Sequence, residues 1–322
     1  MTISEFDIIE RFFKRRTAVR DDVVLGIGDD AALLRVPADR QLVVAMDTLL
    51  AGRHFPPQTS AFDIGWKALA VNLSDLAAMG ADPAWATLSL TLPSADEVWL
   101  EGFAKGLFQL AERYPVELVG GDTTRGPLSV TVQLHGFVEP GKALRRNTAR
   151  AGQKLFVTGT LGDAACALQA LQAGDKPDPD LLLRLNRPEP RVDFGLALAG
   201  TGASVIDISD GLLADLGHVL DASQCGATLW IDQLPCSPAF QSIAGHDALT
   251  YQLYGGDDYE LCFSVDADQV ERLTRHAQQQ QLPVTAIGVV ESQTGIQCVH
   301  DDDRLYTPQG TGFDHFRDTT DG

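Results

Sequence analysis

The chain has 322 residues, of which 44% are apolar and 21% charged, and its formal net charge is -19. This length suits two domains that each bury a core, and the composition is that of a soluble globular protein. The negative charge argues against general nucleic-acid binding and against anionic membrane surfaces, since both need a basic face.

The sequence predicts a cytoplasmic protein. The segment Met1–Glu10 is acidic and lacks the form of a signal peptide. No apolar run approaches the ~20 residues that a membrane helix needs. The five cysteines are widely spaced and form no C-x-x-C pair, so we expect neither a disulfide framework nor a zinc site.

The first half of the chain shows mixed helical and strand patterns. Ser4 is a candidate N-cap for the first helix. The strand predicted at 41–46 is expected to end at Asp47, and the strand predicted at 117–119 to stop at Gly120-Gly121. In chain order, the pattern predicts helices at 3–15, 61–79 and 96–113, and strands at 23–27, 41–46, 85–92, 117–119 and 128–138.

A domain boundary is predicted at 139–152, where a Glu-Pro-Gly turn precedes a short basic cluster. Beyond it, the segment 174–190 contains prolines and is expected to be a linker. The pattern of the second half predicts helices at 163–173, 191–200, 212–223 and 267–281, and strands at 154–158, 204–208, 226–231, 260–265 and 284–290.

Aspartates stand beside glycine or small polar residues in motifs spread along the chain. Hard cations such as Mg²⁺ prefer oxygen ligands and are usually held by a few carboxylates together with waters and substrate phosphates. The pattern therefore indicates a nucleotide enzyme that carries phosphate on metal ions. The motifs are Gly26–Asp30, Met46–Thr48, Asn72–Asp75, Gly120–Thr123 and Asp207–Gly211.

Each motif also has a structural explanation. A Gly-Asp-Asp turn is often only a loop, and Asp47 fits an ordinary turn or cap. Asp75 would face solvent if the helix around it were not so apolar. Ser209 or Asp210 fits the N-cap of the helix that follows.

Two further features carry open alternatives. His54 fits a substrate contact or a surface histidine. The segment Gly255–Glu260 is another glycine-acid turn entering a strand. The Walker A motif, the kinase catalytic loop and the nucleophile elbow are missing from the sequence.

Taken in order, the motifs resemble those of the thiamine-monophosphate kinase family, in the superfamily that includes aminoimidazole ribonucleotide synthetase and selenophosphate synthetase. The DTL-x-x-G-x-HF and NLSDLAAMGA stretches point to the thiamine family. The motifs that carry the resemblance are GIGDDAA, MDTLLAGRHF, NLSDLAAMGA, GGDTT, IDISDGL, GGDDYEL and a closing GTGFDHF.

The resemblance implies a mixed α/β, two-domain fold of the aminoimidazole ribonucleotide synthetase type. It implies a domain at 1–140 that binds Mg and ATP and forms a homodimer, and a domain at 141–322 that completes the ATP and substrate site. The implied activity is ATP-dependent phosphorylation of thiamine monophosphate to thiamine diphosphate, the last step of thiamine diphosphate biosynthesis. The expected ligands are ATP, thiamine monophosphate and several Mg²⁺ ions.

Site residues are carried over by motif. The implied Mg²⁺ ligands are Asp30, Asp47, Asp75, Asp122, Asp207 and Asp210. The implied ATP contacts are Gly121, Asp122, Arg146 and Ser209, although Arg146 also fits a surface linker arginine. The implied contacts to thiamine monophosphate are His54, Asp258 and Phe313. The ligands come from both halves, so the metal cluster is expected between the domains.

The sequence departs from the family pattern in three places. Ala45 and Met46 stand where relatives often have hydroxyl residues, so a metal contact there would come from backbone carbonyl or be lost. The GGED of many relatives is GGDD here, and Phe313 replaces a larger aromatic residue.

The implied chemistry is direct in-line phosphoryl transfer. The acceptor is an already ionised phosphate oxygen, so we expect no general base and no covalent catalytic nucleophile. The alternatives are a related synthetase of the same superfamily that acts on another acceptor, and a non-catalytic metal-binding protein. Selenophosphate synthetase is disfavoured because the N-terminal segment lacks a Cys or Lys nucleophile pair.

Overall fold

The chain divides into two compact units, unit 1 at Met1–Ala143 and unit 2 at Leu144–Gly322. The computed structural model describes residues 4–14 and 20–308, so Phe313 and the closing GTGFDHF motif lie outside the described residues. The roles predicted for the two domains stay predictions. Within the described ranges, no helix is long and apolar enough to cross a membrane.

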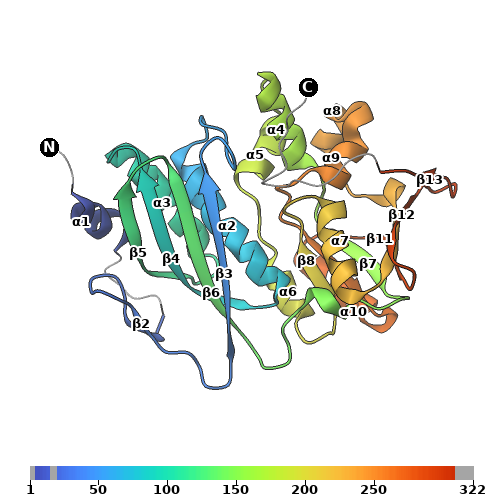
Figure 1. Cartoon of the computed structure of the whole chain (residues 1–322), viewed down its shortest axis with the longest axis horizontal. Coiled ribbons are helices and arrows are strands. Elements are labelled where there is room, and N and C mark those ends of the chain that lie inside the picture. The colour runs from blue at the N-terminus through green and yellow to red at the C-terminus, as the bar shows by residue number, and fades with distance from the viewer. Residues whose placement is uncertain (1–3, 15–19, 309–322) are drawn as a thin grey trace. The chain divides into compact units, whose positions relative to one another are not determined.

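Unit 1, blue to green in Figure 1, is built on a four-stranded sheet of order β3-β6-β4-β5. β3, β6 and β4 pair antiparallel, while β4 and β5 are parallel. The strands are β3 (Gln41–Leu50), β4 (Asp82–Leu92), β5 (Glu117–Arg125) and β6 (Ser129–Val138).

One face of this sheet is covered by α2 (Ala61–Ala78) and α3 (Glu97–Ala111). The two helices approach closely because glycines meet backbone. A Cβ on Gly65 would lie 2.1 Å from the Phe103 carbonyl oxygen, and one on Gly106 would lie 1.9 Å from that of Phe62. α2 is therefore buried on nearly all sides, which sets the surroundings of its polar residues.

The opposite face of the sheet is covered only in part. The short strands β1 (Val23–Leu25) and β2 (Leu33–Leu34) pair with each other and pack over Trp85 and Phe137. Along the edge strand β3, alternate apolar side chains remain exposed, namely Leu42, Val44, Met46 and Leu50.

At the N-terminal end, α1 (Glu5–Ile8) continues into a π-helical turn at Ile9–Phe13. The Ser4 hydroxyl accepts from the Asp7 amide, and Asp7 bonds back to the Ser4 backbone. This capping box confirms the predicted N-cap.

Unit 2, green to red in Figure 1, holds a seven-stranded sheet of order β13-β12-β9-β11-β7-β10-β8. Its pairings are antiparallel except for β9 with β12. The strands are β7 (Lys154–Thr158), β8 (Ser204–Asp207), β9 (Gly226–Trp230), β10 (Leu261–Val265), β11 (Val284–Glu291), β12 (Gly295–Val299) and β13 (Leu305–Tyr306).

Helices lie on both faces of this sheet. α7 (Leu212–Ser223) packs Leu212, Leu216 and Val219 into one core cluster with strand residues. On the other face, Phe263 of β10 stacks on Phe156 and contacts Phe194 of α6 (Val192–Leu198). The remaining helices are α4 (Asp163–Ala173), α5 (Pro179–Asn186), α8 (Pro238–Ile243), α9 (Ala248–Tyr254) and α10 (Ala267–Gln279).

The expected ends of two strands were wrong. β3 does not stop at Asp47 but continues to Leu50, because its register with β6 runs unbroken to the Leu50–Ser129 pair. β5 does not stop at Gly120-Gly121 but runs to Arg125 beside β4. A register shift just before the glycines takes up the irregularity.

The predicted linker at 174–190 was wrong in part, since it contains α5. Asp178 caps this helix by accepting from the Asp180 amide, and Pro179 occupies its first turn. Leu181 and Leu185, one turn apart, are buried. Proline at the first helical position is compatible with a helix, so the proline content alone was a poor guide.

Candidate functional site

Asp47 points to the helix-covered side of the unit 1 sheet. It pairs with Val132, which pairs in turn with Leu88. Both of these line the small apolar gap between the sheet, α2 and α3. Asp47 is therefore a half-buried carboxylate in the middle of a strand.

Asp122 occupies the other face. It pairs with Ser89, which pairs with Thr131, and Thr131 shares a 2.8 Å hydroxyl hydrogen bond with Thr48. All of these positions are polar, and Asp122 is exposed. The register of unit 1 thus separates Asp47 from Asp122 by the thickness of the sheet.

Gly121 shapes the strand that carries Asp122. Its φ is +151°, and a Cβ there would lie 1.8 Å from the Leu88 carbonyl oxygen. Only glycine permits this close approach of β5 to β4. A Cβ on Gly120, by contrast, would have no neighbouring atom within 4 Å, so the two glycines have different roles.

α2 contributes Asp75 and, one turn earlier, Asn72. Asn72 is 0% exposed, and its side-chain amide donates to the Ala68 carbonyl at 3.1 Å. Its Oδ1 atom finds no hydrogen-bond partner among the described residues. Because residues three apart share a helix face, an unsatisfied amide oxygen and a half-buried carboxylate lie together on α2.

The Gly-Asp-Asp turn follows β1. Asp29 Oδ1 accepts from the Asp30 amide at 2.8 Å, so Asp29 shapes the turn. Both side chains are exposed. This bond gives Asp29 a contact within the turn, and Asp30 stays the predicted ligand of the motif.

His54 closes the turn that follows β3. Its Nδ1 accepts from the Leu50 amide at 3.0 Å, and its carbonyl accepts from the buried Lys67 ammonium at 3.4 Å. An accepting Nδ1 leaves the proton of the neutral ring on Nε2. The imidazole is half-buried and held by the backbone.

In unit 2, Asp207 ends β8 and is buried, and the loop 208–211 follows it. The Ile208 amide donates to the Glu260 carbonyl, and the Tyr259 and Asp257 amides donate to Ile208 and Ser209 carbonyls, all at 2.8–2.9 Å. The loop therefore runs beside the GGDDYE segment and brings Asp207, Ser209 and Asp210 together.

The N-cap expected at Ser209 or Asp210 was wrong. The N-cap of α7 is Gly211, at φ +114°, and it makes no side-chain cap bond. Instead the Asp215 carboxylate, inside the helix, accepts from the amides of Ser209, Asp210 and Gly211. Burial raises the pKa of Asp215 to about 7; repulsion from Asp207 and Asp210 adds to this shift, and the amide bonds oppose it.

Arg146 lies in a single 3₁₀ turn, Arg146–Thr148, fixed by its backbone. Its carbonyl accepts from the hydroxyls of Ser204 and Ser223, each at 2.8 Å. Its side chain is exposed. The turn adjoins the start of β8, about 10 Å from Asp207 at the usual rise of a strand.

Asp258 is almost fully buried, and both of its carboxylate oxygens lie 3.1 Å from the Gly162 amide at the start of α4. Burial raises its pKa well above the ordinary value. The structure thus places this predicted substrate contact at a helix N-terminus inside unit 2.

The neighbouring Glu260 is 0% exposed and was not singled out from the sequence. It accepts from Arg191, Arg184 and the Thr158 hydroxyl. Burial opposes its ionisation, but the Arg191 and Arg184 guanidiniums outweigh this and lower its pKa. The signal in the sequence was an acidic residue directly before an apolar strand. Its arginine partners could not be identified, because they lie far away in sequence.

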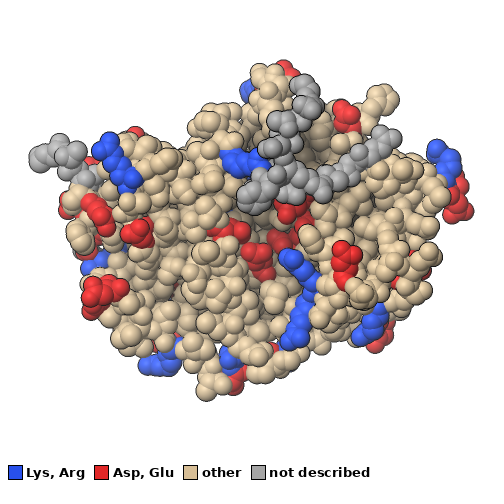
Figure 2. All heavy atoms as spheres, viewed as in Figure 1, with Lys and Arg blue, Asp and Glu red and all other residues tan. Residues whose placement is uncertain are grey.

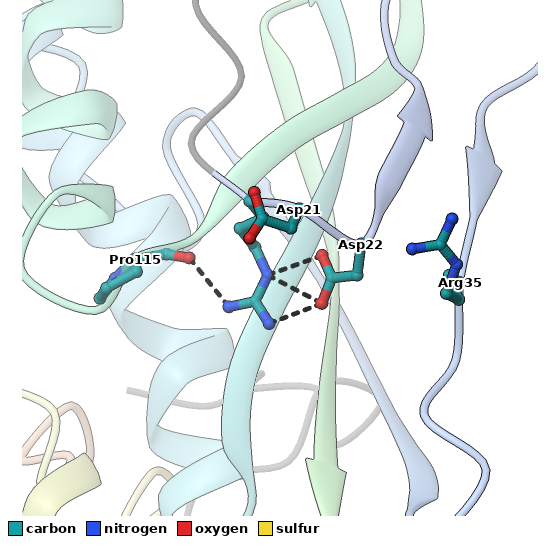
Figure 3. A pocket seen from close by; sticks show the side chains of 5 residues that line it. Asp21, Asp22, Arg35 and Pro115 are labelled. Atoms are coloured by element: carbon teal, nitrogen blue, oxygen red, sulfur yellow. Dashed lines mark hydrogen bonds and ion pairs between the residues drawn. The ribbon is translucent and has the colours of Figure 1, made fainter.

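A depression on unit 1 lies apart from these motifs (Figure 3). It is lined by Asp21, Asp22, Arg35, Pro115 and Arg20. The Arg20 guanidinium bonds to the Asp22 carboxylate and to the Pro83 and Pro115 carbonyls. Asp22 also accepts from the Trp85 indole at 2.9 Å. These bonds hold the segment before β1 against the unit 1 sheet.

The donor set suits Mg²⁺. Its members are carboxylates, whose oxygens are hard ligands, and the buried Asn72 Oδ1, which has no partner among the described residues, lies one turn from Asp75 on α2. Within residues 4–14 and 20–308, no group of three or more His, Cys, Asp or Glu side chains is gathered to hold a metal. Mg²⁺ usually takes only one or two carboxylates, with phosphates and waters as its other ligands.

Charged residues elsewhere are mostly surface groups. Figure 2 shows both acidic and basic side chains exposed on the face that it draws. Several form exposed ion pairs, as Arg11 does with Glu97 and Arg275 with Glu271. Such exposed pairs contribute little to stability and do not indicate a site.

Comparison with known families defines the class of protein. The family of AIR synthase related proteins matches with its N-terminal domain at residues 28–138 and its C-terminal domain at residues 150–301. This confirms the predicted two-domain α/β fold.

Individual relatives narrow the class. Thiamine-monophosphate kinase of Escherichia coli strain K12 is 47% identical over 322 residues, 98% of this chain and 99% of that protein. The crystal structure of thiamine-monophosphate kinase from Stenotrophomonas maltophilia K279a matches with a TM-score of 0.86 and 51% identity, over 92% of this chain and 97% of that one. The structure of AaThiL complexed with AMPPCP and TMP matches with a TM-score of 0.76 and 33% identity, over 90% and 92% of the two chains. The chain belongs to the family of thiamine-monophosphate kinases, as its motifs predicted.

Proposed function

We propose that this chain transfers the γ-phosphoryl group of ATP to the phosphate of thiamine monophosphate, giving ADP and thiamine diphosphate. The observation that carries the proposal is similarity to thiamine-monophosphate kinases along the whole chain. The ATP analogue and TMP bound together in AaThiL support the same pair of substrates for this chain.

The transfer forms a bond between γ-phosphorus and an acceptor phosphate oxygen and breaks the bond from γ-phosphorus to the bridging oxygen of ADP. The acceptor oxygen is already ionised, so no side chain has to remove a proton. The protein's contribution is alignment and charge neutralisation. We propose direct in-line displacement without a phosphoenzyme.

Several Mg²⁺ ions would be held by Asp30, Asp47, Asp75 and Asp122 from unit 1 and by Asp207 and Asp210 from unit 2. Because Asp47 and Asp122 lie on opposite faces of the unit 1 sheet, they would bind different ions. When bound, the ions would neutralise phosphate charge and so lower the repulsion between two anionic substrates. Support comes from the hard-oxygen character of the set and from the unsatisfied Asn72 Oδ1.

The remaining substrate contacts are proposals of the same kind. For ATP we propose contacts at Gly121, next to Asp122 on β5, and at Ser209, whose amide is held by Asp215. The exposed Arg146 side chain suits nucleotide phosphates. For thiamine monophosphate we propose His54, Asp258 and Phe313.

We also propose that the chain forms a homodimer through the face of the unit 1 sheet that α2 and α3 do not cover. The exposed row on β3 is unusual for a free surface, since Met46 is 62% and Val44 51% exposed. Met46→Lys should give a monomer in light scattering after gel filtration. Val98→Lys, at an 81% exposed position on α3, is the control and should leave the mass unchanged. An unchanged mass in both variants would remove this part of the proposal.

A cytoplasmic location completes the proposal. All five cysteines are free thiols, as expected in a reducing compartment.

The direct test incubates the protein with Mg-ATP and thiamine monophosphate and measures ADP and thiamine diphosphate by chromatography. The two products should appear in equal amounts. Formation of ADP without thiamine diphosphate, or transfer only to a different acceptor, would favour the related-synthetase alternative. No ATP turnover with any acceptor would favour a non-catalytic metal-binding protein.

A further inference from the structure

A single carboxylate organises the loop that carries the proposed ligands of unit 2. Asp215 Oδ2 accepts from three successive amides, those of Ser209 at 3.0 Å, Asp210 at 3.0 Å and Gly211 at 3.2 Å. Asp215 is 2% exposed. Successive amides that converge on one point form an anion-binding concavity, and here the protein's own carboxylate fills it.

The other side of the loop is fixed as well. The carbonyls of Ile208 and Ser209 accept from the amides of Tyr259 and Asp257. The loop backbone is thus bonded on one side to Asp215 and on the other to the GGDDYE segment. These bonds fix the backbone positions from which the Ser209 and Asp210 side chains extend.

The packing around the loop leaves little room for an alternative. A Cβ on Gly211 would lie 2.8 Å from the Tyr254 carbonyl group, and one on Gly256 would lie 2.3 Å from the Ser209 carbonyl oxygen. Removing the Asp215 carboxylate would leave three amides without an acceptor in a tight space. Such unsatisfied groups are costly, so the loop would shift to find new partners.

We propose that Asp215 is a positioning residue for phosphoryl transfer. Its carboxylate holds Ser209 and Asp210 in the arrangement that binds the nucleotide phosphates and the cation, without touching either substrate. This inference rests on the proposed function, because that function gives Ser209 and Asp210 their roles.

The test compares Asp215→Ala, Asp215→Asn and, as a control, Asp221→Asn at an exposed position on the same helix. Steady-state rates are measured with Mg-ATP and thiamine monophosphate, well below each variant's melting temperature. Hydrogen exchange of the 209–211 amides is followed without ligands. Exchange needs no activity, so it reports on the loop even if the substrate assignment is wrong.

We expect Asp215→Ala to lower kcat at least about tenfold, the factor that loss of one ordinary hydrogen bond gives. The KM for Mg-ATP should rise and that for thiamine monophosphate should change less. Exchange at 209–211 should accelerate. Asp215→Asn should be intermediate, because its amide oxygen can accept the same bonds, and Asp221→Asn should match wild type.

A purely structural role predicts a lower melting temperature with unchanged kcat and KM in the folded variants, and that result would overturn the proposal. Unchanged exchange at 209–211 in Asp215→Ala would overturn it as well. Absence of thiamine diphosphate with the wild-type chain would instead contradict the proposed function, while the exchange comparison would still decide whether Asp215 holds the loop.

Discussion

Arg191 and Glu260 form a two-pronged ion pair inside unit 2. Arg191 Nε donates to Oε2 at 2.6 Å and Nη2 donates to Oε1 at 2.5 Å. Glu260 has no exposed surface, while the Arg191 side chain is 19% exposed. This pair links Arg191, directly before α6, to the last residue of the GGDDYE motif, directly before β10.

Glu260→Gln should destabilise unit 2 by about 3–5 kcal/mol, the usual cost of breaking a buried ion pair by removing one partner. The substitution keeps the shape but leaves two guanidiniums, those of Arg184 and Arg191, facing a neutral amide. Urea unfolding together with hydrogen exchange of β10 measures the change.

The matched control is Glu271→Gln, which breaks the exposed ion pair with Arg275 on α10. It should leave the unfolding curve unchanged, because exposed pairs of this kind contribute little. If both variants unfold alike, the buried pair does not have the strength assigned to it.

His135 gives unit 1 a pH dependence of defined sign. Its Nδ1 lies 3.3 Å from the Trp85 carbonyl oxygen and its Nε2 lies 3.3 Å from the Gln133 amide nitrogen. The neutral ring with its proton on Nδ1 satisfies both contacts. Burial lowers the pKa of His135 below 6.5, despite the Trp85 bond that opposes the shift.

A lowered histidine pKa means that the unfolded chain takes up the proton first. The contribution of His135 to stability is therefore complete above pH 6.5 and declines as the pH falls toward the folded-state pKa. His135→Gln should weaken the loss of stability between pH 7.5 and 5.5 in urea unfolding. The exposed His218→Gln controls for the loss of an imidazole. A titration of His135 by NMR at or above pH 6.5 would contradict the assignment.

Gly121→Ala should destabilise unit 1 by about 2 kcal/mol or more, since both a positive φ and a backbone clash oppose a side chain there. The added Cβ would meet the Leu88 carbonyl and push β5 away from β4. Gly120→Ala changes the adjacent residue, which has open space, and should cost less. Thermal unfolding of the two variants checks the difference, and equal melting temperatures would show that β5 tolerates displacement.

The sequence predicted what depends on local pattern and failed where distant segments decide. The aspartates that the motifs identified lie in strands, in one helix and in loops. However, the face of a strand on which an acid lies depends on pairing, which is why Asp47 and Asp122 separate onto opposite faces only once β3, β6, β4 and β5 are aligned.

The groups that support the site were invisible for the same reason. Glu260 bonds to Thr158, Arg184 and Arg191, which are 69 to 102 residues away in sequence. Asp215 is close in sequence to the loop 208–211 that it binds. In the sequence alone, however, an aspartate at this place in a helix is as consistent with a solvent-facing residue as with one that accepts from the amides before the helix. The strand ends at Asp47 and Gly120 were predicted from the low preference of aspartate and glycine for strands. Pairing with a neighbouring strand overrides this preference, so both strands continue.

Asp75→Asn tests the proposed metal role most directly. The amide keeps the size of the carboxylate but removes its charge, and Asp75 sits one turn beyond the buried Asn72, whose Oδ1 lacks a partner among the described residues. We expect the variant to fold normally, since its half-buried position tolerates an uncharged isostere. Activity with Mg-ATP and thiamine monophosphate should fall at least about a hundredfold, because each tenfold corresponds to only about 1.4 kcal/mol of lost interaction.

The measurement pairs turnover with calorimetric binding of an ATP analogue at a series of Mg²⁺ concentrations. The variant should need more Mg²⁺ for the same nucleotide affinity, while its melting temperature stays near that of wild type. Asp39→Asn, at an exposed position of the same unit, is the control and should be indistinguishable from wild type in both assays. Wild-type turnover in Asp75→Asn would remove Asp75 from the ligand set, and with it the main contribution of α2 to the site.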